Sequence, residues 1–240
     1  MGMKYMVFFI MSLGTAFGGH LLAQDTASFF EETDSFMKRY VTDGKVDYKA
    51  LVADPSKLDA ILENASSIRV STTNKDVYLA FWINAYNLTV IKGVVDNYPL
   101  ESPLEVKGFF DTLKYTLGGE WLTLNDIENI KLRARFDEPR FHFVLVCGAR
   151  GCPPLISKAY LPSTLETQLQ SQTVKALNSE AFIKVSDGIV ELSEIFKWYR
   201  DDFLKSWNTE LEFLNHYRSM KVDLGSTIRY YSYDWKLNMK

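Results

Sequence analysis

The sequence predicts a single domain of the α+β class, with N-terminal helices packed on a mostly antiparallel sheet. Amphipathic helical segments come first along the chain, and strand signals with tight turns mix with helices after about residue 115. This order is typical of α+β proteins, whereas regular alternation of strands and helices would indicate a parallel sheet. The 240 residues contain no internal repeat and no long linker, so one domain is expected.

The composition is that of a soluble globular protein, because 47% of the residues are hydrophobic and 24% are charged. A net charge of −3 argues against a nucleic-acid-binding protein. The chain has only three histidines and two cysteines, which excludes a four-cysteine zinc site. We therefore expect no metal and no cofactor, and any thiol or imidazole chemistry must depend on very few side chains.

Residues 1–23 have the features of a signal peptide. Lys4 precedes an apolar stretch over residues 5–13, and small residues then lead to Ala23. We expect cleavage near Ala23, a mature domain of residues 24–240, and a periplasmic or secreted product. The alternative is an uncleaved N-terminal anchor helix, against which the short, glycine-broken apolar run argues. No later segment is apolar enough to predict a transmembrane span.

Three helices are predicted in the first hundred residues. Apolar side chains recur at helical spacing over residues 28–40, 57–68 and 74–98. The apolar stripe of the third helix is interrupted by Asn84, and Asn87 follows one turn later. Because burial of an unpaired amide costs about 1–3 kcal/mol, both asparagines are expected to have hydrogen-bond partners.

The later elements are predicted from turn and cap signals. A two-glycine turn at residues 118–119 joins two short strands, and Asp187-Gly188 joins two more. The alternation of residues 140–147 indicates a buried strand. Helices are expected over residues 126–135, 163–178 (with Ser163 and Glu166 as a capping box), 194–204 (with Ser193 as its cap) and 210–218, and a last strand over 228–233.

Residues 141–155 combine the scarce reactive side chains. His142 lies on the predicted strand, and Cys152 follows a glycine-containing turn just before two prolines. A helix beginning there would favour a Cys152 thiolate, and a nearby imidazole would complete an activated nucleophile pair. The alternatives are a Cys147–Cys152 disulfide or two inert thiols. His142 is otherwise a hydrogen-bonded core residue or a metal ligand, and His216, in a polar helix, is expected at the surface.

Glu128 has two interpretations. It lies three residues after Asn125, which suits the carboxylate of a capping box at the start of a helix. Alternatively, its carboxylate orients His142 or pairs with Arg133. A third segment, residues 196–203, interleaves aromatic and charged side chains; this pattern favours core packing over a sugar- or peptide-contacting edge.

Four blocks of the sequence carry a family pattern when taken in order: residues 81–87, 124–128 with Arg133, 142–155 and 196–203. Together they resemble the family known as domain of unknown function 547. The resemblance extends over about residues 46–203, the family-like core of the domain. Two positions depart from the family's pattern, since Asn129 stands where relatives usually have histidine and Ile156 where arginine is common.

The family's thiol, imidazole, carboxylate and amide are similar in kind to those of papain-like and transglutaminase-like cysteine enzymes. Because the order here is Asn84, Glu128, His142, Cys152, the resemblance implies a permuted version of such a fold. We expect a cysteine-dependent hydrolase or acyl transferase that acts on amide or ester bonds. Cys152 would be the nucleophile and His142 the base; Glu128 or Asn84 would orient the imidazole, or Asn84 would donate to an oxyanion.

The alternative function is not catalytic. In that case the domain binds a peptide, a glycan or an envelope component beside the Asn84 helix. Asn84, Glu128 and His142 would then form a buried polar network that stabilises the fold.

Overall fold

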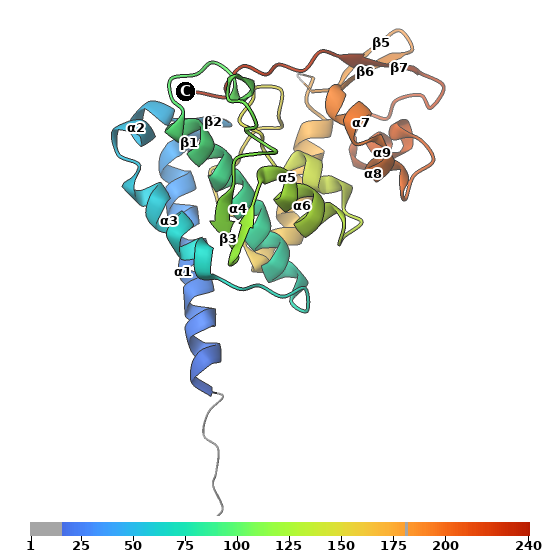
Figure 1. Cartoon of the computed structure of the whole chain (residues 1–240). Coiled ribbons are helices and arrows are strands. Elements are labelled where there is room, and N and C mark those ends of the chain that lie inside the picture. The colour runs from blue at the N-terminus through green and yellow to red at the C-terminus, as the bar shows by residue number, and fades with distance from the viewer. Residues whose placement is uncertain (1–15, 181) are drawn as a thin grey trace, which may run out of the picture.

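A computed structural model describes residues 16–180 and 182–240 (Figure 1). The predicted α+β class is confirmed, because many helices are combined with small sheets. In the described part of the chain the strands are divided over three sheets of two or three strands each. The N-terminal helices therefore pack mainly on one another rather than on one broad sheet.

The N-terminal part consists of four helices, and the first of them projects from the body of the molecule (Figure 1). The expected cleavage position near Ala23 lies in this projecting part, and residues 1–15 of the expected signal peptide lie outside the described residues. None of the described helices combines the length and the apolar character that crossing a membrane requires. The helices are α1 (Ala16–Tyr40), α2 (Tyr48–Ala53), α3 (Ser56–Ser67) and α4 (Lys75–Asp96).

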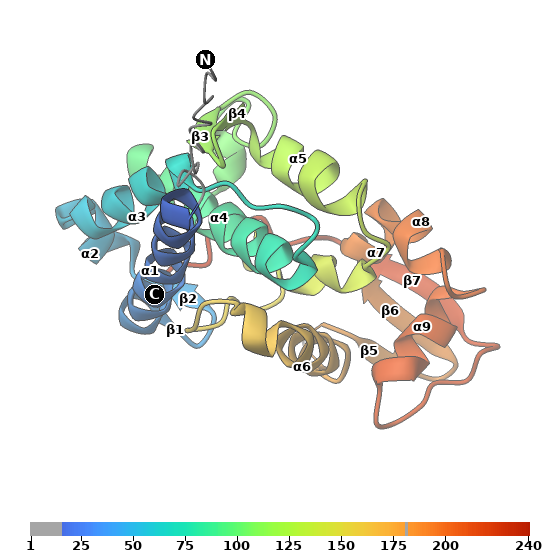
Figure 2. The same ribbon diagram turned by 90° about the horizontal axis from the view of Figure 1, so that it is seen from below.

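Helix α4 is the centre of the fold. Figure 2 shows it in the middle, with α1, α2 and α3 at one side and the C-terminal elements at the other. Every residue from Tyr78 to Val95 except Lys92 is buried, as expected for a helix that is packed on all faces. The side chain of Asn74 caps its first turn by accepting from the Val77 amide, so the predicted start of the helix is confirmed.

One short hairpin lies between α1 and α2, and a second hairpin and a distorted helix follow α4. The predicted turn at Gly118-Gly119 is confirmed, and both glycines have positive φ angles, of 60° and 75°. Thr123 and Asp126 form the capping box of the next helix, so the expected cap role of Glu128 was wrong. The elements are β1 (Val41–Thr42), β2 (Lys45–Val46), the 3₁₀ turn η1 (Pro103–Glu105), β3 (Tyr115–Leu117), β4 (Glu120–Leu122), α5 (Leu124–Asp126) and its π-helical continuation η2 (Ile127–Arg133).

The strand predicted over residues 140–147 was wrong. Its first part is a 3₁₀ helix, η3 (Pro139–Phe143), and the residues after it are a buried segment outside any sheet. The Asn87 side chain donates to the Val144 carbonyl at 2.9 Å and accepts from the Val146 amide at 2.9 Å. One amide side chain on α4 thus supplies the hydrogen bonds that a neighbouring strand would have supplied.

The capping box predicted at Ser163 and Glu166 is not formed. The segment begins with a 3₁₀ turn, η4 (Pro162–Thr164), and continues as α6 (Leu165–Leu177) without a side-chain cap. Glu166 instead accepts from Arg140, at 2.6 Å. A long-range ion pair therefore replaces the local bond expected from the sequence.

The C-terminal part contains a three-stranded sheet and three helices. Strands β5 and β6 are antiparallel, as the predicted hairpin requires, whereas β6 and β7 are parallel. Ser193 caps α7 as predicted, but the expected helix over 194–204 is interrupted at Tyr199. The elements are β5 (Lys184–Ser186), β6 (Ile189–Ser193), α7 (Glu194–Trp198), α8 (Arg200–Leu204), α9 (Glu210–Tyr217) and β7 (Thr227–Tyr231).

The last residues of the chain return to the N-terminal half. The Asn238 amide donates to the Gly148 carbonyl at 2.8 Å, and the Asn238 carbonyl accepts from the Val46 amide at 2.9 Å. The Tyr48 hydroxyl also donates to the Asn238 side chain, at 2.9 Å. This attachment fixes residues 233–235, which form part of the site described next.

Candidate active site

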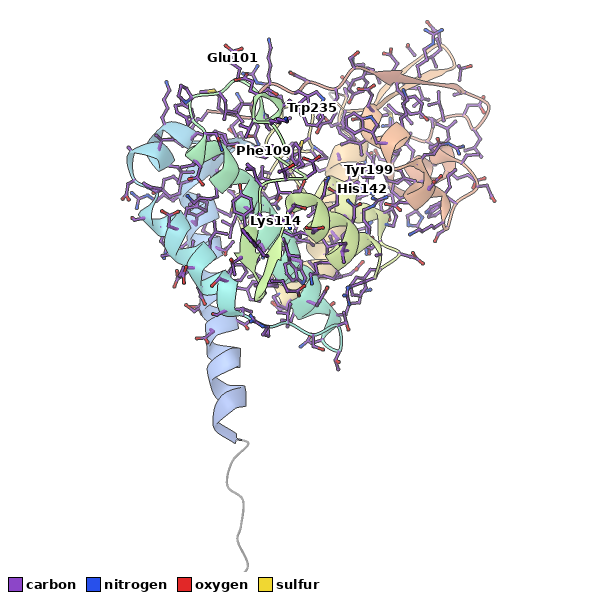
Figure 3. The ribbon with its side chains drawn as sticks, viewed as in Figure 1. Glu101, Phe109, Lys114, His142, Tyr199 and Trp235 are labelled. Carbon is purple, nitrogen blue, oxygen red and sulfur yellow. A yellow bond between two sulfur atoms is a disulfide. The ribbon has the colours of Figure 1, made fainter. Side chains whose placement is uncertain are left out.

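A cavity of about 480 Å³ lies where α4, η2, η3, α7 and the C-terminal segment meet. His142, Glu128 and both cysteines line it, so the structure brings together three of the four expected site residues. In Figure 3, His142 and Tyr199 lie beside each other, and Phe109 and Trp235 come from two loops that contribute to the cavity. The remaining lining residues are mostly apolar or aromatic, which is typical of a small-molecule site.

His142 is held by a carboxylate from a distant part of the chain. Its Nε2 atom lies 2.9 Å from Oδ2 of Asp202, on α8, and its side chain is almost completely buried. The same Asp202 oxygen accepts from Nε of Arg133 at 2.5 Å. The Arg133 guanidinium in turn donates to the Asn129 side chain. Asp202 therefore orients the imidazole. The expectation that Glu128 or Asn84 does so was wrong.

The charges of this group follow from burial and pairing. Burial lowers the pKa of His142, although Asp202 and Glu128 act in the opposite direction. Burial would raise the pKa of Asp202, but hydrogen bonds from His142 and Arg133 outweigh it and hold that pKa well below its usual range. At neutral pH the pair is thus a neutral imidazole and a carboxylate. Because a carboxylate can only accept, Nε2 carries the proton and Nδ1 keeps its lone pair.

Tyr199 connects His142 to Glu128. Its ring stacks on the imidazole with centroids 3.9 Å apart, and the Arg133 guanidinium lies 4.8 Å from the ring centroid. Burial, and then the charge and hydrogen bond of Glu128, raise the pKa of the Tyr199 hydroxyl. Glu128 is only 8% exposed. The predicted contact between Glu128 and His142 is therefore indirect, through Tyr199 and through charge.

Cys147 and Cys152 are joined in a disulfide. This was one of the alternatives left open by the sequence. The Tyr233 hydroxyl lies 2.9 Å from Sγ of Cys152 and 3.1 Å from Sγ of Cys147. The backbone amide of Cys147 also donates to Sγ of Cys152, at 3.0 Å. Two donors are thus directed at the Cys152 sulfur, and they would stabilise a thiolate if the disulfide were reduced.

The helix that would favour a Cys152 thiolate does not begin here, since residues 151 and 152 lie in a turn and a bend and residues 153 and 154 have no regular secondary structure. On the predicted strand the side chains of His142 and Cys147 would point to opposite faces, whereas in the structure both line the cavity. With no regular strand at this point, the alternation rule of a strand does not apply. The donors to the Cys152 sulfur are therefore a backbone amide and a tyrosine rather than a helix terminus.

Asn84 lies outside the cavity lining. Its amide nitrogen donates to the carbonyls of Ala80 and Tyr160 at 2.8 and 2.7 Å, and its oxygen accepts from the Tyr160 amide at 3.0 Å. The expectation that Asn84 and Asn87 have partners is confirmed. Since both N–H donors and the oxygen of the Asn84 amide are engaged with the backbone, its place in the structure is that of a fold-stabilising residue.

The C-terminal half supplies site residues that were not singled out from the sequence. Asp202 and Tyr199 belong to the block 196–203, in which core packing was the favoured interpretation. Phe196 and Phe203 do pack in the core, while Trp198 and Tyr199 line the cavity. The adjacent acidic pair at residues 201–202 beside buried aromatic residues was the available signal. Tyr233 and Trp235 had no local signal beyond their aromatic character.

One wall of the cavity is an aromatic cluster. The Trp198 ring lies 5.0 Å from Tyr233 and 5.9 Å from Trp235, and the last two rings are 4.8 Å apart, all between centroids. Trp198 remains 44% exposed. This wall can contact an apolar part of a ligand.

Among the described residues, no three His, Cys, Asp or Glu side chains come close enough together to hold a metal ion. His216 is exposed, as predicted, and its ring lies 4.8 Å from that of Trp207. His142 is thus the histidine that the structure places in the cavity.

The fold and the site define an α+β domain in which a cysteine pair and a buried imidazole line one cavity, and a carboxylate behind that lining orients the imidazole. Residues 70–176 match the family model described as "Protein of unknown function, DUF547". The resemblance inferred from the sequence blocks is therefore confirmed for this segment, and the fourth block, residues 196–203, lies beyond it. No curated protein and no solved structure matches the chain.

Proposed function

We propose that the cavity is the active site of a cysteine-dependent hydrolase or acyl transferase that acts on amide or ester bonds when its disulfide is reduced. The carrying observation is that Asp202 orients His142, with Oδ2 and Nε2 2.9 Å apart, and that His142 and Cys152 both line the cavity. A neutral imidazole oriented by a carboxylate is the arrangement that activates a neighbouring thiol.

The first step is reduction of the cysteine pair. An external dithiol transfers two electrons and two protons to the Cys147–Cys152 disulfide and is itself oxidised to a disulfide. Cys152 then loses its proton to Nδ1 of His142. The Cys147 amide and the Tyr233 hydroxyl stabilise the resulting thiolate.

The second step is acyl transfer. The Cys152 thiolate attacks the carbonyl carbon, so a C–S bond forms, and the bond to the leaving nitrogen or oxygen breaks. The imidazolium of His142 gives its proton to the leaving group. Water, or an amine in a transferase, then attacks the thioester and passes a proton through His142, which releases the acyl product and restores the thiol.

The proposed location of the protein is the periplasm or the exterior, on the strength of the signal-peptide features of residues 1–23. An oxidising compartment favours the disulfide form. Activity would then depend on a dithiol reductant in that compartment.

Acylation by p-nitrophenyl acetate tests this function. Cys147→Ser leaves Cys152 as the only cysteine, since the chain has two. We expect mass spectrometry to find an acetyl group on Cys152 that neutral hydroxylamine removes, as it does from a thioester. The matched variant Cys152→Ser, which leaves only Cys147, is expected to carry no such group. Equal labelling of both variants, or of neither, would contradict the proposed function.

A second candidate is a binding domain without catalysis. The disulfide and the aromatic wall of Trp198, Tyr233 and Trp235 favour it, because both suit a fixed surface for an apolar ligand. A peptide, a glycan or an envelope component would then occupy the cavity beside α4. Ligand binding without acylation of Cys152 would support this candidate.

A further inference from the structure

Glu128 is a buried charged group that the proposed mechanism does not use. Asp202 already orients His142, and the cap of α5 is made by Asp126. The Glu128 side chain nevertheless lines the cavity while being 8% exposed. A buried carboxylate is costly without a compensating partner, so its retention here calls for one.

The partners of Glu128 within the protein compensate its charge only in part. Its carboxylate has a hydrogen bond with the Tyr199 hydroxyl, and its charge also acts on the hydroxyls of Tyr86 and Tyr233; all three hydroxyls are neutral groups. Arg133 also feels this charge, but it already forms an ion pair with Asp202 at 2.5 Å. No ion pair to Glu128 is formed within residues 16–180 and 182–240. Arg133 and the exposed Lys205 both pair with Asp202, so neither of these cations is paired with Glu128, and the neighbouring imidazole is neutral.

The surroundings of Glu128 suit a cation. Aromatic rings attract a cation to their faces, and Trp198 and Tyr233 stand in the same cavity wall. Among the described residues that line the cavity, Lys107 is the one lysine or arginine, and it is exposed. Glu128 is thus the buried charged side chain of the cavity lining, and most of the other lining side chains are apolar or aromatic.

We propose that Glu128 and the surrounding aromatic rings form a subsite for an ammonium group, so that the substrate or the acyl acceptor carries a positively charged amine. The identification of the bound amine as a substrate or acyl acceptor rests on the proposed function. Binding of an ammonium group at the subsite does not require a reactive thiol. The ammonium donates to the Glu128 carboxylate, and the apolar part of the ligand contacts the aromatic cluster. An anionic ligand is excluded by the same charge.

Binding of three small probes tests the subsite in the oxidised protein. The probes are 2-phenylethylammonium, its neutral counterpart 2-phenylethanol and the anion 3-phenylpropanoate, followed by tryptophan fluorescence. We expect the cation to bind at least about tenfold more tightly than the alcohol, because a hydrogen bond to a buried charge is among the stronger ones. The anion is expected to bind most weakly.

Matched variants assign the selectivity to one carboxylate. Glu128→Gln is expected to bring the ratio of cation to alcohol affinity close to one, whereas Glu128→Asp keeps the charge and most of the selectivity. Asp111→Asn removes an exposed carboxylate of the same cavity and is expected to change the ratio less than about twofold, because exposed charges are screened. If Asp111→Asn abolishes the selectivity and Glu128→Gln does not, the recognition is a surface effect and the subsite is wrong.

The remaining outcomes also decide the question. Equal affinity of the cation and the alcohol in the parent protein, or no binding of any probe, would overturn the subsite. Selective binding of the cation by a protein whose Cys152 is never acylated would leave the subsite standing and reject the proposed function. Acylation of Cys152 in a protein that binds the cation no better than the alcohol would reject the subsite and leave the proposed function standing.

Discussion

Asp202→Asn is expected to slow acylation of Cys152 by about 10²- to 10⁴-fold, the range that a positioned general base contributes. The carboxylate accepts from Nε2 of His142 and so keeps the lone pair on Nδ1. An amide in its place can donate to Nε2 and favour the other tautomer, which puts the proton on the nitrogen that must act as the base. The measurement is the rate of p-nitrophenyl acetate acylation in the Cys147→Ser background.

The control for Asp202→Asn uses another partner of the same carboxylate. Lys205 lies 3.6 Å from Asp202 and is exposed, so Lys205→Gln is expected to change the rate less than about twofold.

The pH profile of the acylation rate distinguishes a loss of His142 positioning from a loss of the folded structure. The parent rate should fall as the pH drops through the lowered pKa of His142, and this limb should change in Asp202→Asn. A folded Asp202→Asn protein that reacts within about threefold of the parent rate would show that Asp202 does not prepare His142.

Asn87→Leu is expected to lower the free energy of unfolding by about 2–5 kcal/mol, because two buried backbone groups lose their partner and each costs ~1–3 kcal/mol when unsatisfied. These groups are the Val144 carbonyl and the Val146 amide. The expected effect is large because no strand lies beside this segment to replace the lost bonds. Urea unfolding followed by circular dichroism measures it.

The matched control for Asn87→Leu is the same substitution at an exposed asparagine. The Asn208 side chain bonds only a nearby glutamate in the described structure, so Asn208→Leu should change stability by less than about 0.5 kcal/mol. Asn87→Asp keeps the acceptor for Val146 but cannot donate to Val144, and an intermediate loss is expected. A loss below about 1 kcal/mol in Asn87→Leu would mean that the segment is held by packing rather than by these bonds.

Elements with local signals could be predicted from the sequence. Helix α4 begins directly after Asn74, the first residue of the range predicted for it, and the hairpin of β3 and β4 turns at Gly118-Gly119. Both depend on residues that are neighbours along the chain. The strand expected over 140–147 was wrong because its alternating pattern was real but its hydrogen-bond partner is Asn87, about sixty residues away.

The candidate site was only partly predictable from the sequence, because some of its contacts join residues that are far apart along the chain. His142, Glu128 and the two cysteines were recognised by their scarcity and by the family resemblance, and they line one cavity. Asn84 was placed in the site because it is a polar residue on an apolar stripe, but its amide binds the Tyr160 backbone. Asp202 is sixty residues from His142, and only the packing of α8 beside η3 brings the two together.

The most direct test of the central claim is the pKa of the Cys152 thiol in the Cys147→Ser protein, taken from the pH dependence of its alkylation by iodoacetamide. We expect a pKa below the value of about 8.5 that is ordinary for cysteine, since the backbone amide of residue 147 and the Tyr233 hydroxyl donate to the sulfur. In the proposed mechanism His142 also accepts the proton of this thiol. We also expect Tyr233→Phe to raise this pKa. A Cys152 pKa at or above about 8.5, unchanged in Tyr233→Phe, would contradict an activated thiol at this site.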